Sequence, residues 1–248
     1  MPQPPKIEII KMWEKKVKKT IYTLNIDNYL PELVKITYPF MERYAEKIGA
    51  EFKIITERKF PDMPIVYEKL QVYELAQKDA NDWNIYIDSD TLIHPETIDF
   101  TEFLPKDTVA QNGLDMAAIR WKSDRFFRRD KRHIGTCNWF TIFSDWCIDM
   151  YKPIDDMTLD EILKSIYPTV AEINFGMPLE HFVDDFVISR NVAKYGLKYT
   201  TLKQMEVALG LPEASFFWHQ YLISGEEKIR QIKEIVKKQW DLSKYLKE

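Results

Sequence analysis

The stretch over residues 84–93 constrains the chain most, because an apolar run leads directly into two carboxylates. Residues 85–87 are of the β-branched and aromatic types that favour a buried strand, and Asp88 and Asp90 follow at positions i and i+2. Side chains at this spacing lie on one face of a strand. Two like charges held this close repel each other unless a cation lies between them, and hard divalent cations prefer carboxylate oxygens. The stretch therefore predicts a metal site at the carboxyl edge of an α/β sheet, where ligands usually bind in such folds.

Other interpretations of the two carboxylates fit the neighbouring residues less well. A calcium-binding EF-hand would require an acid or amide at position 92 and a glycine at 93, but the chain has Leu92 and Ile93. The phosphatases of the haloacid dehalogenase type have Asp-x-Asp-Gly-Thr, whereas Thr91 stands here in place of the glycine. A pair of acids that caps a strand-to-loop turn remains open, because aspartate is a common turn residue.

Composition narrows the classes of protein. The 248 residues are enough for one large α/β domain, and 45% hydrophobic residues can supply its core. A net charge of −4 argues against a general nucleic-acid binder. Two cysteines make no disulfide framework, and no apolar run approaches the ~18 residues of a membrane span. We expect no transmembrane segment and a cytoplasmic location.

The first part of the chain alternates between strand and helix patterns. We predict strands over residues 20–26 and 51–56, joined by a helix over 31–48 whose apolar residues recur at helical spacing before Gly49. A second helix over residues 67–78 then leads to the strand that carries the carboxylates. Two β-α-β units favour a parallel sheet with right-handed crossovers.

The remainder of the chain continues the α/β pattern as one domain over residues 20–248, after a Pro- and Lys-rich leader over residues 1–19. We predict further strands at 108–112 and 138–144. We also predict a helix that starts within residues 145–151, two helices over 159–167 and 180–195, and a final amphipathic helix with Ile229, Ile232, Val236 and Trp240 on one stripe. In the helix over 180–195 we expect Phe182, Phe186 and Ala193 to face inward. A basic segment over residues 120–133 is most simply a solvated loop, or else a cover for an anionic ligand.

In this order of elements the chain resembles the glycosyltransferases of the GT-A fold, and most of all the family of galactosyl- and xylosyltransferases that retains anomeric configuration. The resemblance spans most of residues 20–220, and its distinctive part is the Asp88-x-Asp90 strand with the lysine-bearing helix before it. The stretches that carry it are residues 44–49, 67–70, 83–90 and 138–143, Trp146, the pair Asp184-Asp185 and the pair Trp218-His219. Where the family has a small residue after the asparagine matched by Asn138, this chain has Trp139.

The resemblance implies a metal-dependent transferase. Asp90 would be a direct metal ligand, Asp88 would bind the metal or the ribose, and His219 would be the third ligand. This set suits Mn²⁺ better than Mg²⁺, although either is possible. The alternative for His219 is a partly buried histidine that is hydrogen-bonded beneath the last helix, because apolar flanks usually indicate core.

Other side chains are candidates for binding the substrate or for catalysis. Asn25 and Asp27 follow the first strand and could bind a uracil or ribose, with turn capping as an equal alternative. Lys69 could reach the phosphates or lie on a solvated helix face, and Asn138 is expected near the donor sugar. Asp184 and Asp185 fall in the first turn of a predicted helix, where the dipole favours acids. The resemblance implies that Asp185, or failing that Asp184, lies beside the transferred sugar.

The resemblance thus implies a glycosyltransferase that moves a hexose or pentose from a nucleotide-diphosphate sugar, with a UDP-sugar as the expected donor, to a glycan or another hydroxyl acceptor with retention. Two alternatives stay open. A sugar nucleotidyltransferase usually has a Gly-rich loop after the first strand, and residues 25–28 contain no glycine. A non-catalytic nucleotide-sugar binding module would bind the ligand without turnover.

Overall fold

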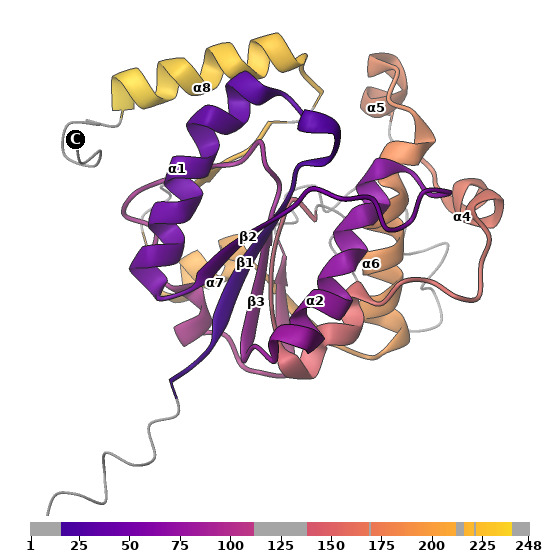
Figure 1. Ribbon diagram of the computed structural model, residues 1–248, viewed down its shortest axis with the longest axis horizontal. Helices are drawn as coiled ribbons and strands as arrows, with labels where there is room; N and C mark the ends of the chain where they lie inside the picture. The colour runs from indigo at the N-terminus through magenta and orange to yellow at the C-terminus, as the bar shows by residue number, and fades with distance from the viewer. Residues whose placement is uncertain (1–15, 112–137, 169, 212–215, 221, 240–248) are drawn as a thin grey trace, which may run out of the picture.

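A mixed β-sheet between two layers of helices forms the centre of the protein (Figure 1). The computed structural model describes residues 16–111, 138–168, 170–211, 216–220 and 222–239. Within these residues the sheet has six strands, in the order β2 (Glu51–Ile55), β1 (Lys19–Leu24), β3 (Trp83–Ile87), β6 (Phe140–Ser144), β5 (Thr108–Gln111) and β7 (Lys198–Thr201). The strand β6 pairs antiparallel with both neighbours, and the other pairs are parallel. The predicted mostly parallel α/β sheet is therefore confirmed.

The first β-α-β unit agrees with its prediction, except that β1 ends at Leu24 and a 3-10 helix begins at Ile26. Helix α1 (Pro31–Ile48) begins with a proline, whose fixed φ suits the first helical turn, and ends at Gly49. Gly49 has a φ of 67°, the left-handed conformation in which glycine commonly ends a helix. The strand β1 begins at Lys19, the last residue of the expected leader, and residues 1–15 of that leader lie outside the described residues.

The helix predicted over residues 67–78 differs from the structure in its first half. A 3-10 helix (Ile65–Gln71) precedes the α-helix α2 (Val72–Asp79). The carboxylate of Glu68 is fully buried and accepts the backbone N–H groups of Lys59 and Phe60, each at 2.9 Å. These bonds tie the segment to the preceding loop, and the tighter 3-10 geometry buries four consecutive residues, Tyr67 to Leu70.

Alternation along the strands gives each face of the sheet its own core. In β1 and β3, Ile21 and Ile85 pack on one face with α1, while Tyr22 and Tyr86 pack on the other face with residues of α2. All four side chains are fully buried, as expected where helices cover both faces. The order β2-β1-β3 places the carboxyl ends of these parallel strands side by side at one edge.

The remaining described helices around the sheet are shorter than α1. They are 3-10 helices at Ile26–Asn28, Phe100–Glu102, Asp145–Tyr151 and Leu179–Phe182, and the α-helices α4 (Leu159–Ser165), α5 (Val170–Phe175), α6 (Val183–Lys194), α7 (Leu202–Ala208) and α8 (Gly225–Gln239). Among the described helices, none combines the length and the apolar character that a membrane crossing requires. The basic segment over residues 120–133 and Trp240 lie outside the described residues.

The helix predicted over 180–195 is a 3-10 turn followed by α6. Phe182 and Ala193 are buried as expected, but Phe186 is only half-buried. The fully buried residues of α6 instead include Val183 and Val187.

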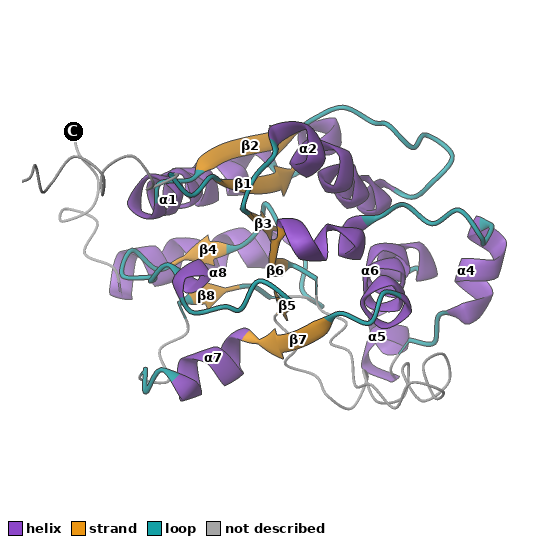
Figure 2. Cartoon of the chain, turned by 90° about the horizontal axis from the view of Figure 1, so that it is seen from below, coloured by secondary structure: helices purple, strands orange, loops and turns teal. Residues whose placement is uncertain are grey.

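A two-stranded ribbon lies beside the main sheet (Figure 2). It pairs β4 (Leu92–Ile93) antiparallel with β8 (Phe217–Trp218). These strands are more than a hundred residues apart in the chain, so the ribbon brings the C-terminal part of the sequence to the end of β3.

Candidate metal centre

Asp88 and Asp90 lie in the turn that leaves the carboxyl end of β3, as predicted. The backbone N–H of Asp88 donates to the carbonyl of Trp139 at 2.7 Å, just before β6. On the other side, the hydroxyl of Thr37 in α1 donates to the carbonyl of Ser89 at 2.6 Å. The turn is therefore held by the sheet and by α1, which fixes the direction of both carboxylates.

His219 reaches the same place through the ribbon. Leu92 pairs with Trp218, so Asp90, two residues before Leu92, and His219, one residue after Trp218, lie at the same end of the two strands. The imidazole ring stacks on Trp139, with centroids 4.8 Å apart and planes 11° from parallel. The ring plane of His219 is therefore set by an aromatic neighbour.

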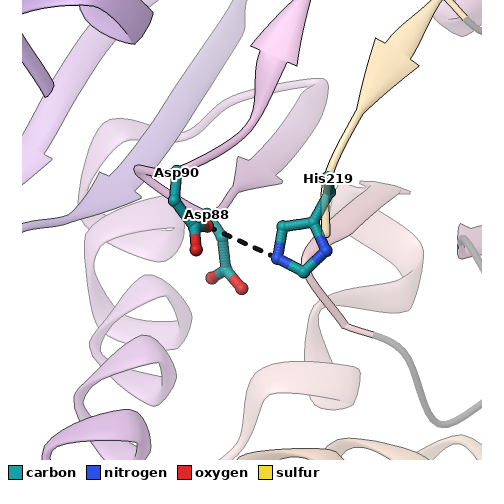
Figure 3. Close-up of side chains that lie close together, drawn as sticks. All are labelled: Asp88, Asp90 and His219. Carbon is teal, nitrogen blue, oxygen red and sulfur yellow. Dashed lines mark ion pairs between the residues drawn. The ribbon is translucent and has the colours of Figure 1, made fainter. Parts of the chain in front are cut away.

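The three side chains converge (Figure 3). One ligand atom each from Asp88, Asp90 and His219 lies within 4.8 Å of the others, and Nε2 of His219 is 3.4 Å from an oxygen of Asp90. Two carboxylates and an imidazole are a donor set that Mn²⁺ accepts and that Mg²⁺ tolerates. His219 is mostly buried, as the core interpretation expects, and its Nε2 faces a carboxylate, as a ligand role requires.

Asp90 is charged although it is buried. Its residue is 7% exposed, and its carboxylate also contacts the ammonium of Lys228 from α8. Burial by itself favours the neutral acid, but His219 and Lys228 outweigh it and hold the pKa of Asp90 well below its usual range. The two neighbouring nitrogens therefore favour the charged form of Asp90, which is the form that binds a cation.

Lys69 is not on a solvated helix face, so that alternative is wrong. Its residue is 7% exposed, and its ammonium lies 2.9 Å from an oxygen of Asp88 and 2.7 Å from an oxygen of Asp184. Burial would lower the pKa of Lys69, but Asp184 and Asp88 raise it well above its ordinary value. Lys69 thus links the turn after β3 to the N-terminus of α6.

Asn138 lies beside Asp185 at the start of α6. Its backbone N–H and its side-chain amide both donate to one oxygen of Asp185, at 3.0 and 2.8 Å. The amide oxygen of Asn138 accepts from Gln111 at the end of β5, at 2.7 Å. The carboxylate of Asp185 is therefore oriented by Asn138, which Gln111 holds in turn, whereas Asp184 is 2% exposed and bound to Lys69.

Asn25 and Asp27 lie at the end of β1, the strand next to β3. Neither caps the short 3-10 helix at Ile26–Asn28, for which no side-chain cap bond is found. The side-chain oxygen of Asn25 is buried and has no partner among the described residues, while Asp27 is exposed with a φ of 55°. The capping alternative is therefore wrong for this helix, and both side chains remain candidates for a ligand at this edge.

Two residues at the site were missed by reasoning from the sequence. Partial burial and the carboxylates of Asp90 and Asp88 raise the pKa of the Tyr29 phenol, which places Tyr29 near the carboxylates. Lys228 contacts Asp90 from the first turn of α8. A signal for Lys228 was present, because it stands four residues before Ile232 and so continues the apolar stripe of that helix.

Comparisons with known proteins give the fold and no closer relationship. No protein-family model matches the sequence, and no curated protein matches it. Among solved structures, a glycosyltransferase involved in the glycosylation of the major capsid of PBCV-1 is 13% identical, with 87% of this chain and 98% of that chain covered and a TM-score of 0.51. A Drosophila β-1,4-galactosyltransferase 7 mutant in complex with manganese, UDP-Gal and xylobiose is 12% identical, with 86% of this chain and 80% of that chain covered and a TM-score of 0.47. The first likeness confirms the predicted fold: the chain has a fold that occurs among glycosyltransferases.

Proposed function

We propose that this protein is a metal-dependent glycosyltransferase that moves a hexose or pentose from a UDP-sugar to a hydroxyl group of a glycan or another acceptor, with retention of configuration. The observation that carries the proposal is the convergence of Asp88, Asp90 and His219 at the carboxyl edge of the sheet. The fold supports it, because a glycosyltransferase has a similar fold, with 87% of this chain covered and a TM-score of 0.51.

The three converging side chains would hold the cation. Asp90 and His219 would be direct ligands, and Asp88 would bind the cation or the ribose of the donor. A divalent cation supplies Lewis-acid stabilisation of the diphosphate leaving group. Lys69 holds the carboxylate of Asp88 in position, because its buried ammonium lies 2.9 Å from that carboxylate.

Asp185 is our candidate for the carboxylate beside the transferred sugar. Asn138 fixes its orientation with two hydrogen bonds, and Asp185 lies close enough to Lys69 to contribute to the raised pKa of that ammonium. A fixed carboxylate stabilises the positive charge of an oxocarbenium-like transition state. Asp184 is the weaker candidate, because its charge is already neutralised by Lys69.

Asn25 and Asp27 are our candidates for binding the nucleoside. They follow β1, the neighbour of β3, and the buried oxygen of Asn25 has no partner among the described residues. A buried acceptor of this kind costs free energy unless a ligand or water donates to it. An N–H group of a base or a hydroxyl of a ribose would satisfy it.

Thermal unfolding with UDP, GDP or CMP, each with and without Mn²⁺, tests the metal and nucleotide site. A ligand present at about 100 times its dissociation constant adds about 2.7 kcal/mol, which raises the melting temperature of a domain of this size by roughly 5–10 °C. We expect this rise with UDP only when Mn²⁺ is present, and we expect Asp90→Asn to lose it. Exposed Asp145 offers a matched control: it follows Ser144, which pairs with Trp83 at the amino end of β3, so Asp145→Asn removes the same charge at the end of β3 opposite to Asp88. No shift with any nucleotide would count against the proposal.

Turnover separates the proposal from its two alternatives. A glycosyltransferase releases UDP from a UDP-sugar, and Asp185→Asn should lower kcat while the binding of UDP and Mn²⁺ persists. A binding module would show the thermal shift without release of UDP. A nucleotidyltransferase would release pyrophosphate from UTP and a sugar phosphate. NMR of the product gives its anomeric configuration and so tests retention.

A further inference from the structure

Lys228 is a buried ammonium at the candidate metal centre. It lies in the first turn of α8, its residue is 7% exposed, and its Nζ contacts one oxygen of Asp90. The other oxygen of Asp90 faces Nε2 of His219 at 3.4 Å. Both oxygens of this carboxylate therefore already have a nitrogen partner within the protein.

The position of Lys228 in its helix is unfavourable by itself. The first turn of a helix favours acids, and Glu226 and Glu227 occupy it here as expected. A lysine in the same turn meets the positive end of the helix dipole, and burial of its ammonium adds a desolvation cost. The contact with Asp90 is the ion pair that offsets these costs among the described residues, and it places the ammonium at the candidate metal centre.

The neighbouring helix fixes where Lys228 can reach. In Figure 1, α8 lies alongside α1 at the top of the molecule. A Cβ atom added at Gly225 would come within 2.9 Å of the side chain of Leu30, so the first residue of α8 packs closely against the loop before α1. Lys228 follows less than one turn later, on the same stripe as the buried Ile232.

We propose that Lys228 competes with the divalent cation for Asp90 and so sets the metal affinity of the site. This inference rests on the proposed metal-dependent function. A cation bound to the same carboxylate would lie within about 5 Å of the ammonium, since metal–oxygen distances are about 2 Å. The two positive charges repel each other in a buried environment, where screening is weak. The ammonium therefore has to move away from Asp90 when the cation binds.

Binding of Mn²⁺, followed by the loss of the electron paramagnetic resonance signal of the free ion, tests this competition without any enzymatic assay. Lys228→Met keeps the length of the side chain and removes its charge, and we expect it to bind Mn²⁺ at least tenfold more tightly than the wild type. Lys228→Arg should stay near the wild-type affinity. Lys237→Met is the matched control, because Lys237 is an exposed lysine of the same helix.

The outcomes separate the inference from the proposed function. If Lys228→Met binds Mn²⁺ no more tightly than the wild type, while Asp90→Asn abolishes binding, competition is wrong and the metal site stands. If no variant binds Mn²⁺, both are wrong. Because Lys228→Met leaves the buried Asp90 without this partner and so changes the stability of the metal-free protein, a second measurement compares the rise in melting temperature on adding Mn²⁺. Competition requires a larger rise for Lys228→Met than for the wild type, and an equal or smaller rise overturns it.

Discussion

Replacing Lys69 with methionine tests whether a buried ion-pair network supports the candidate site. The ammonium of Lys69 lies 2.7 Å from Asp184, whose side chain is 3% exposed, and 2.9 Å from Asp88, whose side chain is 22% exposed. Methionine keeps most of the volume of the lysine side chain, so the substitution mainly removes the positive charge. Asp88 keeps contact with water, and the cost therefore arises mainly at Asp184.

The expected loss is large. Removing one partner of a buried ion pair costs about 3–5 kcal/mol, because the other charge stays buried without compensation. At about 2–4 °C per kcal/mol for a domain of this size, the melting temperature should fall by roughly 6–20 °C. Lys35→Met is the control: Lys35 pairs with Glu32 at 2.8 Å, but its side chain is 70% exposed. Exposed pairs contribute about 0–1 kcal/mol.

Urea unfolding followed by circular dichroism gives the free energy of unfolding of the Lys69→Met and Lys35→Met variants and its dependence on pH. The pKa of Lys69 is raised in the folded state, against the effect of burial, by Asp184 and Asp88. Its contribution is therefore fully present below the unfolded-state pKa of about 10.4 and is lost only as pH rises through the higher folded-state value. The difference between wild type and Lys69→Met should stay constant from about pH 6 to 9.

A double-mutant cycle tests whether the buried Asp184 causes the loss of stability in Lys69→Met. If the cost of Lys69→Met comes from the uncompensated Asp184, then Asp184→Asn should be much less destabilising in the Lys69→Met background than in the wild type. A Lys69→Met variant as stable as Lys35→Met would refute the reasoning, since it would mean that the ammonium is not buried between two carboxylates.

Two further predictions address the support of the site and the outer surface. Trp139→Ala should cost about 3–5 kcal/mol in urea unfolding, as for other buried tryptophans, and should weaken Mn²⁺ binding because His219 loses the ring on which it stacks. Trp139→Phe should cost less in both assays, and equal effects of the two variants would contradict this role. The hydrogen bond from Arg190 lowers the pKa of Asp156 to about 2, against a small effect of burial and with help from Lys194. Asp156→Asn should remove about 0–1 kcal/mol of stability, as for other exposed ion pairs. This contribution should be present above pH 4 and vanish as pH falls through about 2. A stability difference that persists below pH 2 would exclude the ion pair as its source.

The parts of the fold that local patterns determine could be predicted from the sequence. The helix α1 has an apolar stripe at helical spacing, a proline at its start and Gly49 at its end, and its bounds agree with the prediction. The strand β3 is buried on both faces and ends at Ile87, immediately before Asp88. The carboxyl edge of the sheet could be assigned because parallel strands end at the same edge.

The partners of the candidate site residues could not be predicted in this way, because each comes from a distant element. The burial of Lys69 depends on Asp88 and Asp184, which stand 19 and 115 positions later in the sequence. The stretch around Lys69 has the composition of an amphipathic helix, and nothing local distinguishes a solvated lysine from one that bridges two carboxylates. His219 was assigned through the resemblance to a family, and the local apolar flanks indicated only a core position.

Lys228 shows where a physical signal existed within the sequence itself. The stripe of α8 carries Ile232 and Val236 at intervals of four residues, and the next position toward the N-terminus is a lysine. A charged residue on the buried stripe, in a helical turn where the dipole opposes a cation, conflicts with two local preferences at once. Conflicts of this kind are expected at functional sites, where a distant partner compensates for them. Here that partner is Asp90, 138 residues earlier in the chain, and the conflict alone would have marked Lys228 as a residue with a buried anionic partner.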